Sequence, residues 1–112
     1  MKYLMLVVAD PEAAGETGEG TLPIEEWGDL VDSKNAWIIG DRLRPVSDAT
    51  TVRRRGGELL VTDGPFAETR EWIAGFDVLE CKDLDEAIEI ASLHPQASGG
   101  KIELRPFWPL EG

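Results

Sequence analysis

The chain has 112 residues, a length typical of one domain, which we expect to span residues 1–112. Its composition, 42% hydrophobic and 29% charged, is that of a folded globular domain and excludes an intrinsically disordered chain. The net charge of −11 repels nucleic-acid phosphates and anionic membranes, so we expect direct binding to neither.

The first third of the chain predicts a strand, a loop and a helix. The apolar run Tyr3–Ala9 predicts a strand covered on both faces, and it is too short for a membrane span or a secretory signal. The acidic, glycine-rich stretch 10–20 predicts a loop. The segment Thr21–Asn35 predicts a helix capped by its first residue, with Pro23 in its first turn and Asn35 ending it at positive φ. Its apolar residues recur on one face: Ile24, Trp27, Leu30 and Val31.

The middle of the chain predicts a strand, a hairpin and a tight turn. Ala36–Gly40 predicts the second strand. The runs Thr50–Arg55 and Glu58–Thr62 flank Gly56-Gly57, a two-residue turn signal, and predict a β-hairpin. The turn Asp63-Gly64-Pro65-Phe66 follows. In this turn Asp supplies a side-chain acceptor, Gly an unusual φ and Pro a fixed one.

The last third predicts a central strand, a helix and a final strand. Both alternating sets of residues in Trp72–Cys81 are largely apolar, which indicates a central strand, and Gly75 indicates a bulge or a close backbone approach. Asp83 and Glu86 match a capping box that begins the second helix, which Pro95 ends. After it we expect a loop, a strand and a stiff aromatic tail, at residues 96–100, 101–105 and 106–109.

The order of the elements predicts the fold class. Without the hairpin the chain has two β-α-β halves, which predicts an α+β, ferredoxin-like fold with an inserted β-hairpin. Two helices can cover only one face of such a sheet. Because Tyr3–Ala9 and Trp72–Cys81 are apolar on both sides, we expect the open face to pack on a second copy, as a homodimer. Four tryptophans fit an interface, although they could instead enlarge one core.

The long motif around the turn carries a family resemblance. The run GGELLVTDGPFAETREWIAGF from Gly56 to Phe76 resembles the signature of the YCII-related, DGPF-domain family. Further matches lie in the second helix and around the last strand, at Leu84–Ile88, Gly100–Glu103 and Arg105-Pro106. The resemblance covers nearly the whole chain.

The resemblance implies a dimeric α+β barrel of ferredoxin-like halves, with a cleft at the edge of the dimer sheet and a largely undefined biochemical role. Some relatives are encoded near, or fused to, sigma factors of the extracytoplasmic-function type, which implies a regulatory association. In the YCII branch a histidine on the first helix and a nearby aspartate resemble a catalytic dyad. The predicted helix Thr21–Asn35 has no histidine, so that dyad is not carried over.

Three further residues are candidates for chemistry. Asp63 is either a turn former whose carboxylate accepts bonds from the amides near Pro65 and Phe66, or a general base and ligand anchor. We interpret His94, in the last turn of the second helix, as a cation that the helix dipole stabilises. We expect Cys81 to be a small buried hydrophobic residue, with no partner for a disulfide, which fits a reducing cytoplasm. We predict no metal site and no cofactor.

The arginines allow two interpretations. Arg53 and Arg55 lie on one face of the predicted hairpin and Arg54 on the other, which is typical of a solvated edge. The functional alternative is an anion clamp in which Arg53 acts with Arg42, Arg44 or Arg70 near the turn.

These observations leave three functions open. The first is a cytoplasmic, dimeric binding or accessory module. It holds a small anionic ligand beside Asp63-Gly64-Pro65-Phe66, with Arg42, Arg53 and Arg70 as further ligand-binding residues, or it contacts a protein partner. The second is a cofactor-free enzyme with Asp63 as general base and an arginine stabilising negative charge. The third, regulation of a sigma factor, follows from the resemblance alone.

Overall fold

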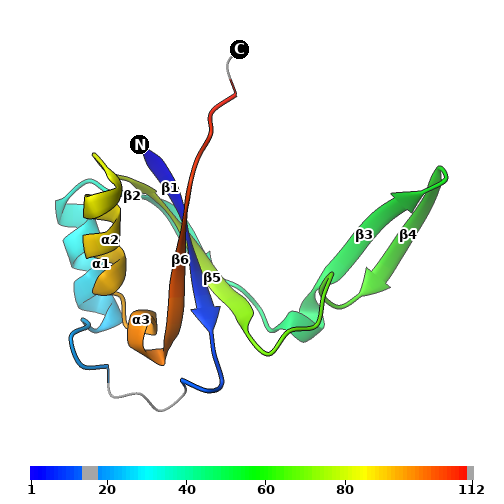
Figure 1. Cartoon of the computed structure of the whole chain (residues 1–112), viewed down its shortest axis with the longest axis horizontal. Helices are drawn as coiled ribbons and strands as arrows, with labels where there is room; N and C mark the ends of the chain where they lie inside the picture. Colours follow the sequence, from blue (N-terminus) through cyan, green and yellow to red (C-terminus); the bar gives the residue numbers. More distant parts are fainter. Residues whose placement is uncertain (14–17, 111–112) are drawn as a thin grey trace.

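The computed structural model describes residues 1–13 and 18–110 and has the α+β architecture that the sequence predicts (Figure 1). In chain order the elements are β1 (Lys2–Ala9), α1 (Ile24–Ser33), β2 (Trp37–Arg42), the short 3-10 helix η1 (Val46–Asp48), β3 (Thr50–Arg55), β4 (Glu58–Asp63), β5 (Trp72–Glu80), α2 (Leu84–Ser92), α3 (Gln96–Gly99) and β6 (Gly100–Pro106). The hairpin β3–β4 thus lies in the middle of the chain, between the two halves that carry the longer helices.

The strands form two separate sheets. Four of them make an antiparallel sheet in the order β2-β5-β1-β6, and β3 pairs only with β4. The pairing of β1 with β5 shifts by one residue, because Val7 pairs with Gly75 and Val8 with Ile73. A Cβ on Gly75 would lie 3.0 Å from the Asp41 carbonyl oxygen of β2. Gly75 therefore lies at both the bulge and the close backbone approach that the sequence indicated.

The two longer helices cover one face of the four-stranded sheet, and the core lies between them and the sheet (Figure 1). Tyr3 and Met5 of β1 and Leu79 of β5 face this core and are at most 2% exposed. Trp27 Nε1 donates a hydrogen bond to the Ile90 carbonyl oxygen at 2.9 Å, which joins α1 to α2. The remaining core residues are small or apolar: Val31, Ala36, Cys81, Ala87, Ile90 and Ala91.

The core confirms the expected burial of Cys81 but contains only one of the four tryptophans. Cys81 is buried as expected, and burial raises the pKa of its thiol. Of the four tryptophans only Trp27 belongs to the core, because Trp37, Trp72 and Trp108 are 41%, 39% and 94% exposed. The alternative in which the tryptophans enlarge one core therefore holds for Trp27 alone.

The start of α1 corrects one expectation and its end confirms another. The helix begins at Ile24 with Pro23 as the cap, and Thr21 does not cap it, because its hydroxyl donates to the Gly18 carbonyl oxygen at 2.6 Å. The first helical bond runs from Trp27 N to the Pro23 carbonyl oxygen, 2.9 Å away. Asn35 has a φ of 52° just after the helix, as the sequence predicted.

The capping box of α2 is present, but the expected loop after the helix is wrong. Asp83 Oδ1 accepts from Glu86 N at 2.9 Å, and Glu86 Oε1 accepts from Lys82 N at 3.1 Å. Residues expected to form a loop instead form α3, with Pro95 in helical conformation at its start. Proline ends one helix here and begins the next, since its fixed φ suits a first helical turn.

His94 is neutral, which corrects its interpretation as a cation at a helix end. Its side chain is buried, 7% exposed, and its ring packs edge-on against Trp27, with ring centroids 4.8 Å apart. Nδ1 accepts a hydrogen bond from Gln96 N at 3.0 Å. Burial lowers the pKa of His94 to about 4, because loss of hydration disfavours the charged ring more than the helix end favours it.

None of the helices in residues 1–13 and 18–110 combines the length and the apolar character that crossing a bilayer requires.

We predict that His94 makes stability depend on pH. Its folded pKa of about 4 lies below the ordinary value of 6.5, so its contribution is present above pH 6.5 and is lost as the pH falls toward 4. The loss should be on the order of 2 kcal/mol in the free energy of unfolding. Urea unfolding at pH 7.5 and 4.5 should show it in the native protein and a smaller loss in His94→Gln. Equal losses in the two proteins would contradict the assignment.

Candidate functional site

The Asp63-Gly64-Pro65-Phe66 turn lies where the hairpin joins the rest of the chain. Gly64 N donates to the Ala49 carbonyl oxygen at 2.7 Å, and Thr51 Oγ1 donates to the Gly64 carbonyl oxygen at 2.7 Å. These two bonds connect both sides of the hairpin base. Gly64 has a φ of 99°, a conformation that residues with a side chain resist.

The side chains of this turn are open to solvent. Asp63 ends β4 opposite Thr50 and is exposed, and Phe66 is 86% exposed. The expected bonds from the Asp63 carboxylate to the amides near Pro65 and Phe66 are absent from residues 1–13 and 18–110. The Thr51 hydroxyl holds the turn by donating to the Gly64 carbonyl oxygen. The turn therefore presents a free carboxylate and an aromatic ring on a fixed backbone.

The three arginines expected as ligands come from separate places. Arg53 pairs with Leu60 and Asp63 with Thr50, so Arg53 and Asp63 point to opposite faces of the hairpin, about 10 Å apart along the strand. Arg42 ends β2, and Arg70 Nη2 forms an ion pair with Glu12 Oε1 at 2.8 Å. Arg53 therefore points away from Asp63, and Arg70 is already paired with Glu12.

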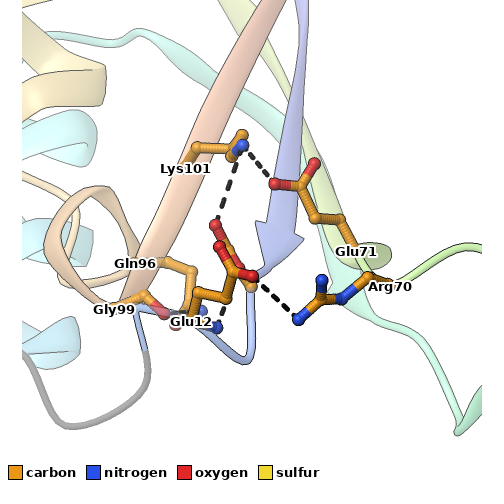
Figure 2. A network of polar contacts seen from close by, with 7 residues as sticks. Glu12, Arg70, Glu71, Gln96, Gly99 and Lys101 are labelled. Atoms are coloured by element: carbon orange, nitrogen blue, oxygen red, sulfur yellow. Dashed lines mark hydrogen bonds and ion pairs between the residues drawn. The ribbon is translucent and has the colours of Figure 1, made fainter.

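A different set of charges does meet, at the end of the sheet where β1 ends and β5 begins (Figure 2). Lys101 Nζ donates to Glu71 Oε1 and lies 3.8 Å from Asp10 Oδ2. An open hollow of about 300 Å³ lies beside Asp10 and Glu71, and the neighbouring Glu12–Arg70 ion pair also lines it. We call these five residues the sheet-end network: Asp10, Glu12, Arg70, Glu71 and Lys101.

Arg70 alone among the members of this network is a candidate from the sequence, because strand register brings the others together. Ala9 pairs with Trp72, and Val8 pairs with Lys101, so residues just beyond these strand positions must meet. The hydrogen bond to Glu71 is the main cause of the raised pKa of Lys101. A network of paired surface charges can order three strand ends, but it offers no free nucleophile or base.

Asp77 is a second group that the sequence did not indicate. Burial raises the pKa of its carboxyl, while the hydrogen bond from Trp37 Nε1, at 2.9 Å, opposes that shift. Asp77 pairs with Gly40, and a Cβ on Gly40 would overlap the Asp77 carboxylate. The glycine therefore leaves the space that this half-buried carboxylate occupies.

Residues 1–13 and 18–110 contain no cluster of three or more His, Cys, Asp or Glu side chains placed to hold a metal ion. His94, the single histidine of the sequence, is held in the core against Trp27 and not at the turn.

The other candidate surface is the face of the four-stranded sheet that the helices leave uncovered (Figure 1). Leu4, Leu6 and Val8 alternate with the buried Tyr3 and Met5 and so point away from the helices. The residues of β5 that pair with them are also apolar, and so is Ile39 of β2, which pairs with Val78. We call this the open face and define it by Leu4, Leu6, Val8, Ile39, Ile73, Phe76 and Val78.

Within one chain the helices cover β1 on one face only, so the expected cover on its other face stays a prediction. Ile39 and Ile73 are 55% and 43% exposed there. Charged residues of β6 border the face, because Lys101, Glu103 and Arg105 pair with Val8, Leu6 and Leu4.

Fold and surface together define a small α+β domain with one helix-covered sheet face, one apolar face and a projecting hairpin. A family model described as "YCII-related domain" matches residues 1–111, so the chain belongs to the YCII-related family. The chain is also 45% identical over 68 residues to an uncharacterized protein of Rhizobium meliloti (strain 1021). That match covers 59% of this chain and 55% of the relative, so it spans little more than half of either protein.

We predict that Gly64→Ala destabilises the fold, because a side chain at a φ of 99° is strained even though the space around it is open. The cost should be about 1 kcal/mol in the free energy of unfolding. The matched control is Gly28→Ala, which also has open space but lies inside α1. It should stabilise by up to about 1 kcal/mol. Chemical denaturation measures both, and equal effects would contradict the role of Gly64.

Proposed function

We propose that the protein is a cytoplasmic, homodimeric binding module of the DGPF branch of its family, with a small anionic ligand held near the Asp63-Gly64-Pro65-Phe66 turn. The observation that carries the proposal is the open face, on which Ile39 and Ile73 are exposed and the other apolar residues are only partly buried. A monomer rarely leaves such a contiguous apolar surface in water.

The topology supports a ferredoxin-like dimer. The order β2-β5-β1-β6, with one helix after β1 and one after β5, fits the split β-α-β arrangement with a hairpin inserted between β2 and β5. A second sheet packed on the open face would complete a dimeric α+β barrel. Paired faces in such assemblies lie about 10 Å apart, with side chains interdigitating between them.

The turn supports the ligand part of the proposal. Its backbone is fixed from two sides by Ala49 and Thr51, while the Phe66 ring and the Asp63 carboxylate remain open. Arg42 lies at the end of β2 and makes no ion pair among the residues described. An anion held there would bond the Arg42 guanidinium, with Phe66 covering an apolar part.

The two other functions stay predictions with less support. A base is efficient when its position is fixed beside a group that stabilises charge. The Asp63 carboxylate has no bond that orients it among the described residues, and Arg53 lies on the other face of the hairpin. Regulation of a sigma factor still follows from the family resemblance alone.

We predict a dimer at micromolar concentration that depends on the open face. Ile39→Asp should weaken dimerisation at least about 100-fold, since it places a charge in an apolar interface. The matched control is Ile88→Asp, because Ile88 lies on α2 and is 49% exposed, against 55% for Ile39. Sedimentation equilibrium measures both, and the control should remain dimeric. A monomeric native protein, or two variants that behave alike, would refute the proposal.

We predict that a panel of carboxylates, inorganic phosphate and phosphate esters contains an anion that raises the melting temperature. At 100 times its Kd such a ligand adds about 2.7 kcal/mol, a shift of several degrees. Arg42→Gln should abolish most of the shift, whereas Arg44→Gln should keep it, because Arg44 already pairs with Asp48 at 2.9 Å. Asp63→Asn should change the shift as well. No shift with any anion would count against this site.

A further inference from the structure

The hairpin β3–β4, here called the arm, stands apart from the rest of the chain. It forms its own two-stranded sheet and projects from the side of the main sheet opposite the helices (Figure 1). The radius of gyration is 16.2 Å, whereas a compact chain of this length has about 13 Å. A two-stranded hairpin alone is marginally stable in water, so the arm needs a surface to pack against.

One side of the arm is apolar and uncovered. Val52 pairs with Val61, and Leu59 follows on the same face. These three side chains are 63%, 57% and 52% exposed. The pattern is that of a strand face meant to be half-buried, yet no described residue of the chain buries it.

The tip of the arm carries an excess of positive charge, because Glu58, the cross-strand partner of Arg55, is the one acidic residue among residues 53–58. Arg53-Arg54-Arg55 holds three of the 11 basic residues in a chain of net charge −11. Arg54 Nη1 donates to the Gly57 carbonyl oxygen, and Arg55 Nη1 donates to the Arg54 carbonyl oxygen, both within the tip. Within residues 1–13 and 18–110 none of the three forms an ion pair.

The matching negative charge lies on the helices. α1 carries four acidic residues and no basic one, and α2 carries three acidic residues and no basic one. The acidic residues of the two helices are Glu25, Glu26, Asp29, Asp32, Asp85, Glu86 and Glu89. In one chain the sheet separates them from the arm (Figure 1), so the tip cannot reach its own helices.

A second copy on the open face brings the two charges together. Each arm strand has six residues and therefore reaches about 20 Å. Packed sheets lie about 10 Å apart, and a helix layer lies about 10 Å further out. The reach of the arm thus equals the distance from its own sheet to the helices of a copy facing it.

We propose that each arm clasps the second copy, with the face that carries Val52, Leu59, Val61 and Arg54 against the side of the partner subunit and the arginine-rich tip at its acidic helix layer. Arg53 and Arg55 point to the other face of the arm and reach that layer from the end of the hairpin. The inference rests on the proposed dimer and deepens it. Two-fold symmetry makes the contact reciprocal, since each chain has one arm and one acidic layer. The turn at the base of each arm then lies beside the partner, so the proposed anion site is completed by two chains.

The test compares two triple variants of the tip. In one, Arg53, Arg54 and Arg55 are all replaced by Glu, and in the matched control all three are replaced by Lys. Sedimentation equilibrium should show a dimer Kd at least about tenfold higher for the Glu variant and within about threefold of native for the Lys control. Equal Kd values for all three proteins would overturn the clasp. If Ile39→Asp still dissociated the dimer in that case, the proposed dimer would stand without it. A monomeric native protein would refute both.

A second measurement does not depend on the stability of a charge-reversed variant. The Lys control, mixed in nitrogen-14 and nitrogen-15 forms, is treated with a carbodiimide, which couples lysine amines to adjacent carboxylates. Mass spectrometry should find mixed-isotope crosslinks from residues 53–55 to acidic residues of α1 or α2. Crosslinks from the tip to other regions only, or within single chains only, would overturn the proposal.

Discussion

The structure depends on one constraint: two helices are too few to cover both faces of a four-stranded apolar sheet. On the covered side Met5 and Leu79 are fully buried, and the Trp27 indole joins the two helices across them. On the other side Leu4 and Leu6, one position along the same strand, remain only half-buried. The hydrophobic effect that fixes the helices on one face therefore leaves an unfavourable contact with water on the other.

Electric charge also limits how a second copy could cover the open face. Two copies of net charge −11 repel each other, and that repulsion opposes the burial of their open faces. The acidic residues of α1 and α2 lie on the outer layer, and the arm concentrates its arginines at a tip that extends beyond the sheet. In the proposed dimer this distribution of charge would oppose nonspecific association and favour one relative orientation of the two copies.

Local signals were enough to predict most elements of the fold, whereas long-range packing was not predictable. The Gly56-Gly57 turn and the Asp83 capping box depend on neighbours a few residues away, and both are present. His94 was misjudged because its neutrality depends on burial by Trp27, which is distant in sequence. Pro95 was interpreted only as a helix end, although its fixed φ equally begins α3.

The candidate site was less predictable because it depends on strand register. The two-residue turn at Gly56-Gly57 fixes the pairing of the hairpin, and alternation then places Arg53 and Asp63 on opposite faces. That step could have been taken from the sequence. The sheet-end network of Asp10, Glu71 and Lys101 could not, because it requires β5 and β6 to flank β1 on its two sides.

The position of the turn connects assembly to binding. Gly64 joins the arm to the rest of the chain through its bonds to Ala49 and Thr51, next to Asp63. In the proposed dimer the second copy would hold the arm, and with it this backbone, in one conformation. A ligand that prefers the fixed conformation must then strengthen the dimer by the same factor by which the dimer strengthens its binding, because the two equilibria are thermodynamically linked.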